Sequence, residues 1–140
     1  MIICGVELKA NSAIFSVLNV NDNKKIDYMN VKPKKMILND DENVESIQNF
    51  KNNIDNFIKD NNIEKLVIKK RATKGTFAGG AITFKIEALI QLNLYCEVVF
   101  ISSGSISKFT RKYDTPFPHN LHKYQEQSYL AALAYIKQEK

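Results

Sequence analysis

The amino-acid sequence predicts one α/β domain over residues 1–140, with a mixed five-stranded sheet and helices on both faces. In this sheet, three antiparallel strands are followed by parallel strands. Three observations lead to this expectation. Short apolar runs separated by turns fill the first part of the chain. Segments with helical hydrophobic spacing alternate with further apolar runs in the rest, and 44% hydrophobic residues are enough to build a core.

The first strands are expected at residues 2–8 and 13–20, which are nearly continuous apolar runs and too short for helices. At least one more strand is expected within residues 26–38, where Pro33 favours an edge position or an irregular entry. Turn-forming residues separate these runs. Strands joined by such short turns are expected to pair antiparallel.

The clearest amphipathic helix follows an acidic capping segment at residues 39–42 and ends near residue 60. Its apolar residues recur at helical spacing and are Val44, Ile47, Phe50, Ile54, Phe57 and Ile58. The elements expected after it are, in order, a strand at 66–68, a helix at 80 to about 92, a strand at 95–101, a short helix at 102–112 and a last helix at about 121–137. Strands separated by helices pair parallel through right-handed crossovers.

The chain is basic, with 20 Lys and Arg against 15 Asp and Glu and a net charge of +5. This balance favours an anionic partner such as nucleic acid, although a solvated basic surface without a partner has the same composition. Cys4 and Cys96 lie in predicted strands, and no Cys-x-x-Cys pair provides a zinc site. Buried thiols, with no signal-peptide pattern and no long apolar stretch, predict a cytoplasmic protein without a membrane partner.

Glu7 is the candidate catalytic residue of the first strand, because it is the one charge in an otherwise apolar run. A carboxylate buried in a strand is costly unless it is paired, hydrogen-bonded or bound to a metal. It is therefore expected to be a metal ligand or a general acid or base. The alternative is a carboxylate at a strand end near water, or one paired with a structural lysine.

Glu126 and His122 are the candidate site residues of the last helix. Glu126, Leu130 and Leu133 share one helical stripe, which His122 extends by one turn. If this stripe faces the sheet, Glu126 approaches Glu7, and the two carboxylates are candidate catalytic residues and ligands of Mg²⁺ or Mn²⁺. The alternative is a solvent-exposed acidic residue in the first turn of a helix.

A basic loop with three glycines runs from a strand end into a helix start at residues 69–80. Free backbone N–H groups and the helix dipole favour anions at such a place. We therefore predict contacts with phosphate groups of nucleic acid; the candidate residues are Lys69, Lys70, Arg71, Lys74 and Gly75. The alternative is a solvated basic loop in which the glycines only permit tight turning.

The second helix is apolar on two sides, since Ile82 and Ile86 define one face and Phe84 and Ala88 the other. Such a helix is central in a fold or packs at a subunit interface, so a homodimer through this helix is one candidate assembly. Lys85 and Glu87 lie on the flanks between the two faces. They are additional candidate polar site residues, or simply ion-pair partners.

Four segments resemble an uncharacterised bacterial family, domain of unknown function 3010: ICGVELK at 3–9, KGTFAGG at 74–80, TFKIE at 83–87 with Gln91, and YQEQ at 124–127. The resemblance covers essentially the whole chain. Its most specific part is the block G-x-F-A-G-G…F-K-x-E. The family has no established activity, so the resemblance implies none.

The order of elements also resembles the ribonuclease-H-like fold, especially its Holliday-junction-resolvase branch. This resemblance implies acids on strand one, at the end of the fourth strand and on the last helix. Glu7 matches the first position and Glu126 matches the last, but Lys69 and Lys70 stand at the fourth-strand end. A cation in place of a ligand hinders the assembly of two divalent cations. Glu87 is a candidate substitute, although its spacing does not require this role.

Three functions are consistent with the sequence. The first is a nucleic-acid-binding module that lacks a full set of catalytic residues. The second is a divergent Mg²⁺- or Mn²⁺-dependent nuclease or resolvase that uses Glu7 and Glu126. The third is a homodimeric protein-interaction domain that associates through the Phe84 and Ala88 face of the second helix.

Overall fold

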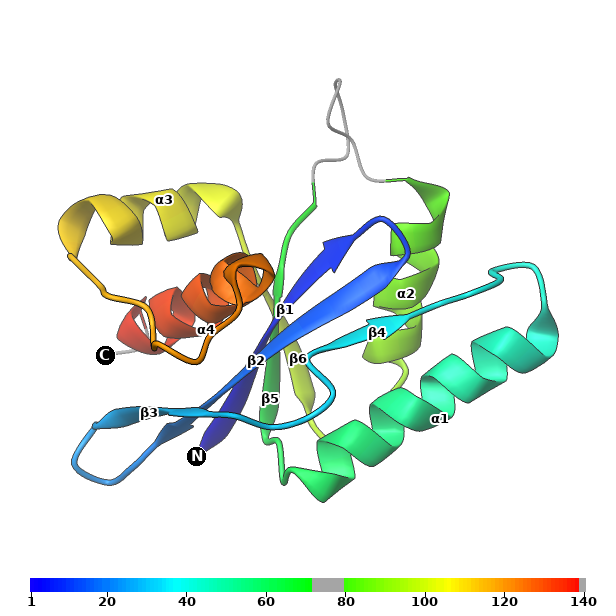
Figure 1. Ribbon diagram of the computed structural model, residues 1–140, viewed down its shortest axis with the longest axis horizontal. Coiled ribbons are helices and arrows are strands. Elements are labelled where there is room, and N and C mark those ends of the chain that lie inside the picture. Colours follow the sequence, from blue (N-terminus) through cyan, green and yellow to red (C-terminus); the bar gives the residue numbers. More distant parts are fainter. Residues whose placement is uncertain (72–79, 139–140) are drawn as a thin grey trace.

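The computed structural model describes residues 1–71 and 80–138. Its strands are β1 (Ile2–Lys9), β2 (Ser12–Val20), β3 (Ile26–Met29), β4 (Lys35–Ile37), β5 (Lys65–Lys69) and β6 (Glu97–Ile101). Its helices are α1 (Val44–Asp60), α2 (Ala81–Gln91), α3 (Ser103–Lys112), the 3₁₀ turn η1 (Lys123–Gln125) and α4 (Glu126–Gln138). The predicted alternation of strands and helices is confirmed, with boundaries within a few residues of those expected (Figure 1).

The sheet has six strands in place of the expected five, in the order β3-β2-β1-β5-β6, with β4 also paired to β2. The extra strand arises because the stretch after β2 forms two short strands. β3 pairs with the second half of β2, and β4 pairs with its first half. Pro33 lies between them and has no N–H for the ladder. The sheet is mixed as predicted: β1 pairs antiparallel with β2 and parallel with β5.

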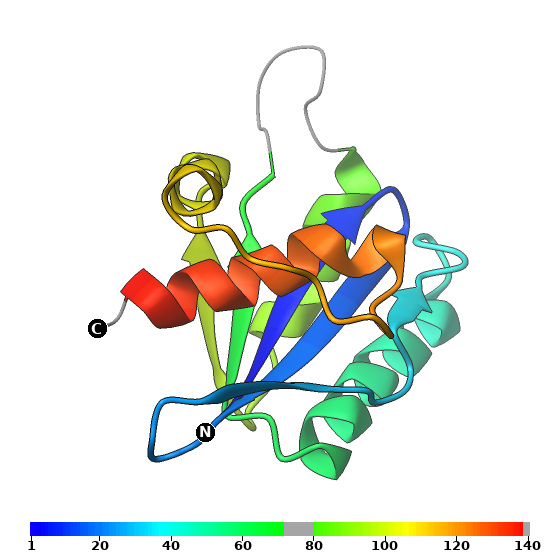
Figure 2. The same cartoon turned by 60° about the vertical axis from the view of Figure 1, so that its left-hand side comes forward.

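Helices cover both faces of the sheet, as Figures 1 and 2 show. Alternate residues of β1 point to opposite faces. Cys4, Val6 and Leu8 belong to the core that contains the buried residues of α1 and α2. Ile3 belongs to a second core, formed with α3 and α4. Gly5 and Glu7 follow Ile3 at two-residue spacing, so they face α4.

Helix α1 forms where the sequence predicts it. Asn43 is its N-cap, and its side-chain oxygen accepts a hydrogen bond from the Ser46 N–H at 2.9 Å. The apolar stripe buries Phe50, Ile54, Phe57 and Ile58 against the sheet. The Phe57 ring stacks on Phe15 of β2 with 4.5 Å between ring centroids. The stripe therefore fixes which face of α1 is covered.

Helix α4 crosses β1 at very short range. A Cβ atom at Gly5 would overlap the carbonyl oxygen of Ser128, so only glycine permits this approach. Ser128 and Ala132, both fully buried, provide the small side chains on the helix side. Ser128 Oγ also lies 2.6 Å from Ser16 Oγ of β2. The crossing point brings the start of α4 next to the C-terminal ends of β1 and β5.

Cys4 and Cys96 are both free thiols, with Cys4 buried and Cys96 half-buried. Burial raises the pKa of the Cys96 thiol to about 11 and raises the pKa of the Cys4 thiol further. Within the described ranges, no helix has the length and apolar content needed to cross a membrane.

Candidate functional site

Glu7 lies near the C-terminal end of β1, on the sheet face covered by α4. It is directly opposite Ile14 of β2, which in turn is opposite Lys35 of β4. Directly opposed residues on neighbouring strands point to the same face. Glu7, Ile14 and Lys35 therefore form one row across the sheet.

Lys69 extends this row on the other side of Glu7. The parallel register pairs Gly5 with Val67 and Val6 with Ile68, so its continuation places Lys69 beside Glu7. The Lys69 ammonium donates a hydrogen bond to Oε1 of Gln127 on α4 at 2.8 Å. Three elements, β1, β5 and α4, thus contribute a carboxylate, an ammonium group and an amide to one place.

The fold makes the Glu7 carboxylate harder to ionise. Partial burial raises the pKa of Glu7, while the positive charges of Lys69 and Lys9 oppose this rise. Among the described residues, no group forms a hydrogen bond or a close ion pair with this carboxylate, although both lysines act on it electrostatically.

Buried polar contacts fix the rotation of α4 about its axis. Gln125, which is 1% exposed, donates from Nε2 to the Phe15 carbonyl oxygen at 2.8 Å. Ser128 is held against Ser16 as described above. Gln127, two residues after Gln125, reaches β5, where its Oε1 accepts a hydrogen bond from the Lys69 ammonium. Glu126 and Gln127 are both half-buried.

The structure therefore brings Gln127, and not Glu126, to the position beside Lys69. In the described part of the chain, no group of three His, Cys, Asp or Glu side chains is arranged to hold a metal ion. The ammonium group of Lys69 also lies next to Glu7, where a second carboxylate would be needed. These residues do not fit a site for two divalent cations.

His122 and Tyr124 form an exposed aromatic pair just before α4. Their rings are 5.2 Å apart between centroids and nearly parallel, at 7°. The Lys35 ammonium lies 5.1 Å from the centroid of the Tyr124 ring. The row through Glu7 therefore ends at a cation and two stacked rings.

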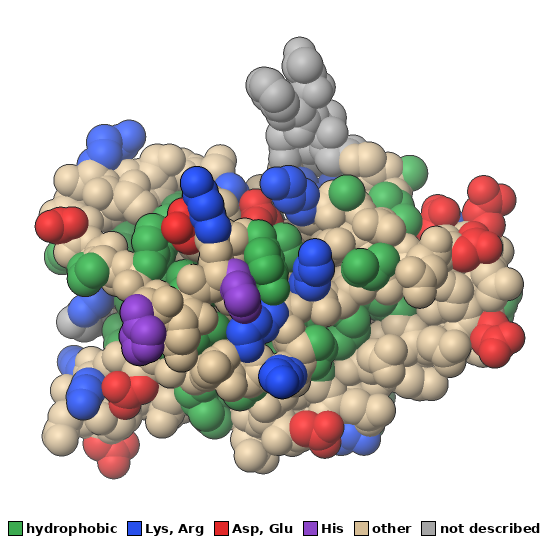
Figure 3. Space-filling view, viewed as in Figure 1, with side chains coloured by type: hydrophobic (Ala, Val, Ile, Leu, Met, Phe, Trp, Pro, Cys, Tyr) green, Lys and Arg blue, Asp and Glu red, His purple; other side chains and the backbone are tan. Residues whose placement is uncertain are grey.

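Basic residues surround this region. Figure 3 shows Lys and Arg side chains gathered between the start of α4 and strand β2, whereas acidic side chains gather over the start of α1. Lys9, Lys35 and Lys70 are exposed. The surface around Glu7 is thus positively charged although it contains a carboxylate.

Three other predicted residues, Arg71, Lys85 and Glu87, have structural partners. Arg71 donates to both carboxylate oxygens of Glu87, at 3.3 and 2.7 Å, and its guanidinium group stacks 3.6 Å from the centroid of the Phe84 ring. Lys85 pairs with Asp41 in the loop before α1, at 3.1 Å. Lys70 is exposed at the end of β5. Lys74 and Gly75 lie outside the described residues.

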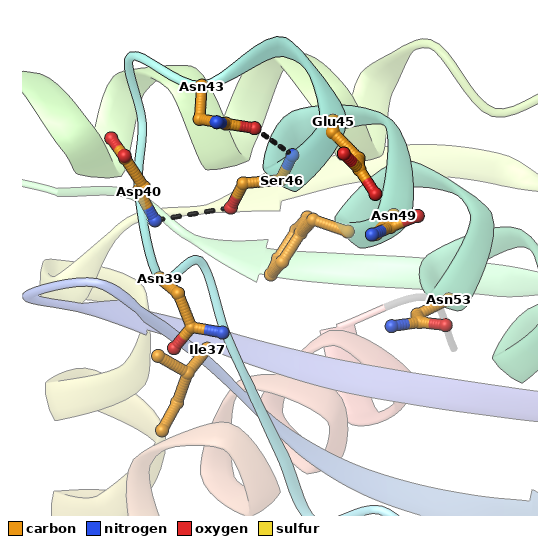
Figure 4. A pocket seen from close by; sticks show the side chains of 9 residues that line it. Ile37, Asn39, Asp40, Asn43, Glu45, Ser46, Asn49 and Asn53 are labelled. Atoms are coloured by element: carbon orange, nitrogen blue, oxygen red, sulfur yellow. Dashed lines mark hydrogen bonds between the residues drawn. The ribbon is translucent and has the colours of Figure 1, made fainter.

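A polar pocket between β4 and the start of α1 is separate from the Glu7 region. Asparagine side chains dominate its lining, with Asp40, Glu45 and Ser46 beside them. Figure 4 shows that Asn43 and Ser46 are already engaged, Asn43 as the helix cap and Ser46 as acceptor from the Asp40 N–H. Local capping accounts for these contacts.

Gln127, Tyr124 and Lys35 are not among the site residues expected from the sequence. A signal for Gln127 existed in the strip Ser128, Ala131 and Ala132, because small residues mark the helix side that approaches the sheet, and Gln127 borders it. Lys35 and Tyr124 had no comparable signal. Their proximity depends on the pairing of β4 with β2.

The fold is shared with known Holliday junction resolvases. The RuvC structure of Thermus thermophilus superposes with a TM-score of 0.71 and 8% identity, over 99% of this chain and 96% of that one. The fowlpox virus resolvase has a TM-score of 0.60 and 17% identity, over 99% of both chains. The yeast mitochondrial resolvase Ydc2 has a TM-score of 0.60 and 9% identity, over 96% of this chain and 77% of that one. The superpositions show a common ribonuclease-H-like fold. At identities this low, they show the fold alone.

No curated protein matches the chain in sequence. The sequence model of one family, described as protein of unknown function (DUF3010), matches residues 1–135. The expected family is thereby confirmed, and the chain belongs to the DUF3010 family, with the ribonuclease-H-like fold of the Holliday junction resolvases.

Proposed function

We propose that this protein is a nucleic-acid-binding domain that binds through the basic surface around Glu7 without a bound divalent cation. One observation carries the proposal. The Lys69 ammonium, held by Gln127 at 2.8 Å, lies beside Glu7 at the strand end where the resolvase resemblance implies an acid. The site therefore has a fixed positive charge of its own.

The physical reason lies in the ligands that a divalent cation needs. Mg²⁺ and Mn²⁺ at phosphoryl-transfer sites are held by several carboxylates, whose negative charge offsets the cation. Here a single carboxylate faces an ammonium group. Lysine contributes a compact point charge that suits phosphate groups, so the same residues favour binding of a phosphate backbone over cation-assisted cleavage.

The kind of partner is supported by the structural neighbours. The Thermus thermophilus RuvC and the fowlpox virus resolvase have both been solved in complexes with Holliday junction DNA. The net charge of +5 favours a polyanion as well. We therefore propose that nucleic acid binds at the end of the sheet where β1 and β5 finish, which carries Lys9, Lys35 and Lys70.

Salt dependence of binding tests this proposal. We expect the triple variant Lys9→Ala, Lys35→Ala, Lys70→Ala to bind labelled junction and duplex DNA more weakly at every salt concentration. The slope of log K against log salt should become shallower by about 2 to 3, since each lost phosphate contact contributes about 0.9. Fluorescence anisotropy between about 50 and 200 mM salt measures both quantities.

A matched control removes the same charge elsewhere. Lys24, Lys25 and Lys108 are exposed on the β2–β3 turn and on α3. Their triple alanine variant should keep the wild-type slope. Equal effects of the two triple variants would mean that binding depends on net charge alone and not on this surface. Absence of binding by the wild type at low salt would refute the proposal.

Cleavage by Glu7 and Glu126 with Mg²⁺ or Mn²⁺ is the competing prediction. Calorimetric titration of the wild type and of Glu7→Gln with each metal decides between the two. We expect the heat measured on adding either metal to be the same for the wild type and for Glu7→Gln. Metal binding that disappears in Glu7→Gln, together with metal-dependent cleavage of junctions, flaps or RNA–DNA hybrids, would favour the nuclease.

Association of two copies through α2 is a separate proposal. It is supported by Phe84 and Ala88, which are exposed on one face of α2, although Arg71 covers one side of the Phe84 ring. Sedimentation of the wild type beside Phe84→Ser tests it. A wild type that stays monomeric at high concentration removes this assembly.

A further inference from the structure

We infer that His122 and Tyr124, with Lys35 beside them, form a platform on which an unpaired nucleobase stacks. The inference rests on the proposed nucleic-acid binding and narrows its ligand. Such a platform favours single strands and branch points over intact duplexes, because bases there are free to leave the helix. The ligand chemistry is an exposed base together with an adjoining phosphate.

The geometry of the pair suits stacking. The two rings are nearly parallel, at 7°, with 5.2 Å between centroids. Tyr124 is 42% exposed, so part of the pair stays accessible to a ligand. Lys35 lies 5.1 Å from the centroid of the Tyr124 ring and adds a positive charge at the same place. Nucleic-acid sites that accept any base combine these two features, an aromatic surface and a nearby cation.

Buried groups hold the backbone of the platform. The His122 N–H donates to Oε1 of Gln125 at 3.0 Å. Gln125 is buried and donates to the Phe15 carbonyl oxygen at 2.8 Å. On the other side, Lys35 is placed by the pairing of β4 with β2. A ligand therefore meets a preformed surface, which limits the entropy lost on binding.

Its position connects the platform to the basic surface. Lys35 and Glu7 are both directly opposite Ile14, on the same face of the sheet. A strand whose phosphates contact Lys9 and Lys70 passes close to this row. A base that turns out of such a strand reaches the rings, whereas a paired base inside a duplex does not.

The test compares single-stranded with duplex ligands of equal length. Oligo-dT and oligo-U are the single-stranded probes, so that DNA and RNA are distinguished, and a blunt duplex is the paired probe. We expect Tyr124→Ala to weaken single-strand binding roughly 5- to 50-fold, as loss of one stacked base does. Duplex binding should change less than about twofold, and Tyr124→Phe should restore single-strand binding because it keeps the ring.

The chain offers a matched control in Tyr95. It is 52% exposed and also has a lysine over its ring, Lys59 at 5.0 Å, but it precedes β6 at the other end of the strands. Tyr95→Ala should bind every probe as the wild type does. Circular dichroism verifies that each variant is folded, and His122→Ala, an exposed substitution, provides a second assay of the platform.

The outcomes separate the two proposals. If the wild type binds no probe, the proposed function fails and the platform fails with it. If the wild type binds duplex and single strand, but Tyr124→Ala weakens both equally or neither, only the platform is refuted. Photo-cross-linking of iodouridine-containing oligonucleotides should label the peptide with His122 and Tyr124; labelling confined to other peptides would also overturn it.

Discussion

Glu7 is the residue whose charge state depends most on the fold. Its carboxylate is partly buried between β2 and β5, and burial raises its pKa more than the charges of Lys69 and Lys9 lower it. A carboxyl group with a raised pKa in the folded state favours folding while it is protonated. Its contribution is complete below the unfolded-state pKa, near 4.5, and is lost as pH rises through the folded-state pKa.

The first prediction concerns the pH dependence of stability. Glutamine has nearly the same shape as glutamate and does not ionise, so Glu7→Gln removes this contribution. We expect the free energy of unfolding of the wild type to fall, relative to that of Glu7→Gln, as pH rises from below 4.5 to neutral pH. Urea denaturation of both proteins across this range measures the difference. A constant difference, or a change of opposite sign, contradicts the burial of Glu7.

A second prediction isolates Lys69. Its positive charge lowers the pKa of Glu7, so Lys69→Met should raise the pKa of Glu7 above the wild-type value. A carbon-detected NMR titration of the Glu7 carboxyl group follows this directly. Lys70→Met removes the exposed lysine that follows Lys69 in the sequence, and it should leave the pKa of Glu7 close to the wild-type value. An unchanged pKa in Lys69→Met would mean that the two groups are not neighbours.

At the scale of elements, two contacts position the site. Helix α4 lies against β1 at Gly5, which brings Gln127 to Lys69. The exit of β5 is joined to α2 by the Arg71–Glu87 pair, in which the two side chains are 8% and 16% exposed. Because both contacts are buried, substitutions there should lower the stability of the protein more than they weaken its binding of nucleic acid.

Gly5→Ala should destabilise the protein strongly. The new Cβ would overlap backbone atoms of Ser128, which cannot move as a flexible side chain would. We expect a loss of about 3 kcal/mol or more in the free energy of unfolding, at the upper end of overpacking effects. In Gly104→Ala, the nearest atom to the new Cβ is 3.8 Å away, and this helical site should gain up to about 1 kcal/mol. Similar losses in both variants would disprove the close crossing.

Arg71→Ala should also act on stability. It leaves Glu87 as a buried carboxylate without its bidentate partner, which typically costs about 3 to 5 kcal/mol. Lys70→Ala, at the exposed neighbouring position, should change stability by no more than about 0.5 kcal/mol. Thermal and chemical unfolding compare the two. A stable Arg71→Ala variant that loses DNA binding would instead assign Arg71 to the phosphate contacts expected from the sequence.

At the scale of the whole molecule, the sheet changes from antiparallel to parallel pairing at β1. The C-terminal ends of β1 and β5 meet the start of α4 there, and β4 brings Lys35 to the same face. The known resolvases share this architecture. This chain combines it with Lys69 and Gln127 beside Glu7, and the proposed function of binding without cation-assisted cleavage rests on this arrangement.

Much of the fold was predictable from local patterns. Hydrophobic spacing located α1 and α2, and turn residues separated β1 from β2. The division of the following stretch into β3 and β4 was not predictable, because each is a short strand that exists only through its pairing with one half of β2. The sequence also identified Glu7 and the lysine at the end of β5, since a charge in an apolar run is visible without a structure.

The sequence by itself determined the order of elements, the buried stripes and the presence of an ionisable group on β1. Only the tertiary structure decided which helix residue reaches that group. The rotation of α4 is set by Gly5, Ser16 and the buried Gln125, which are distant in sequence. A rotation by one residue, about 100°, exchanges Glu126 for Gln127 at the site. Helical periodicity gives the spacing of side chains along one helix, whereas the face that meets the sheet is fixed by contacts between segments.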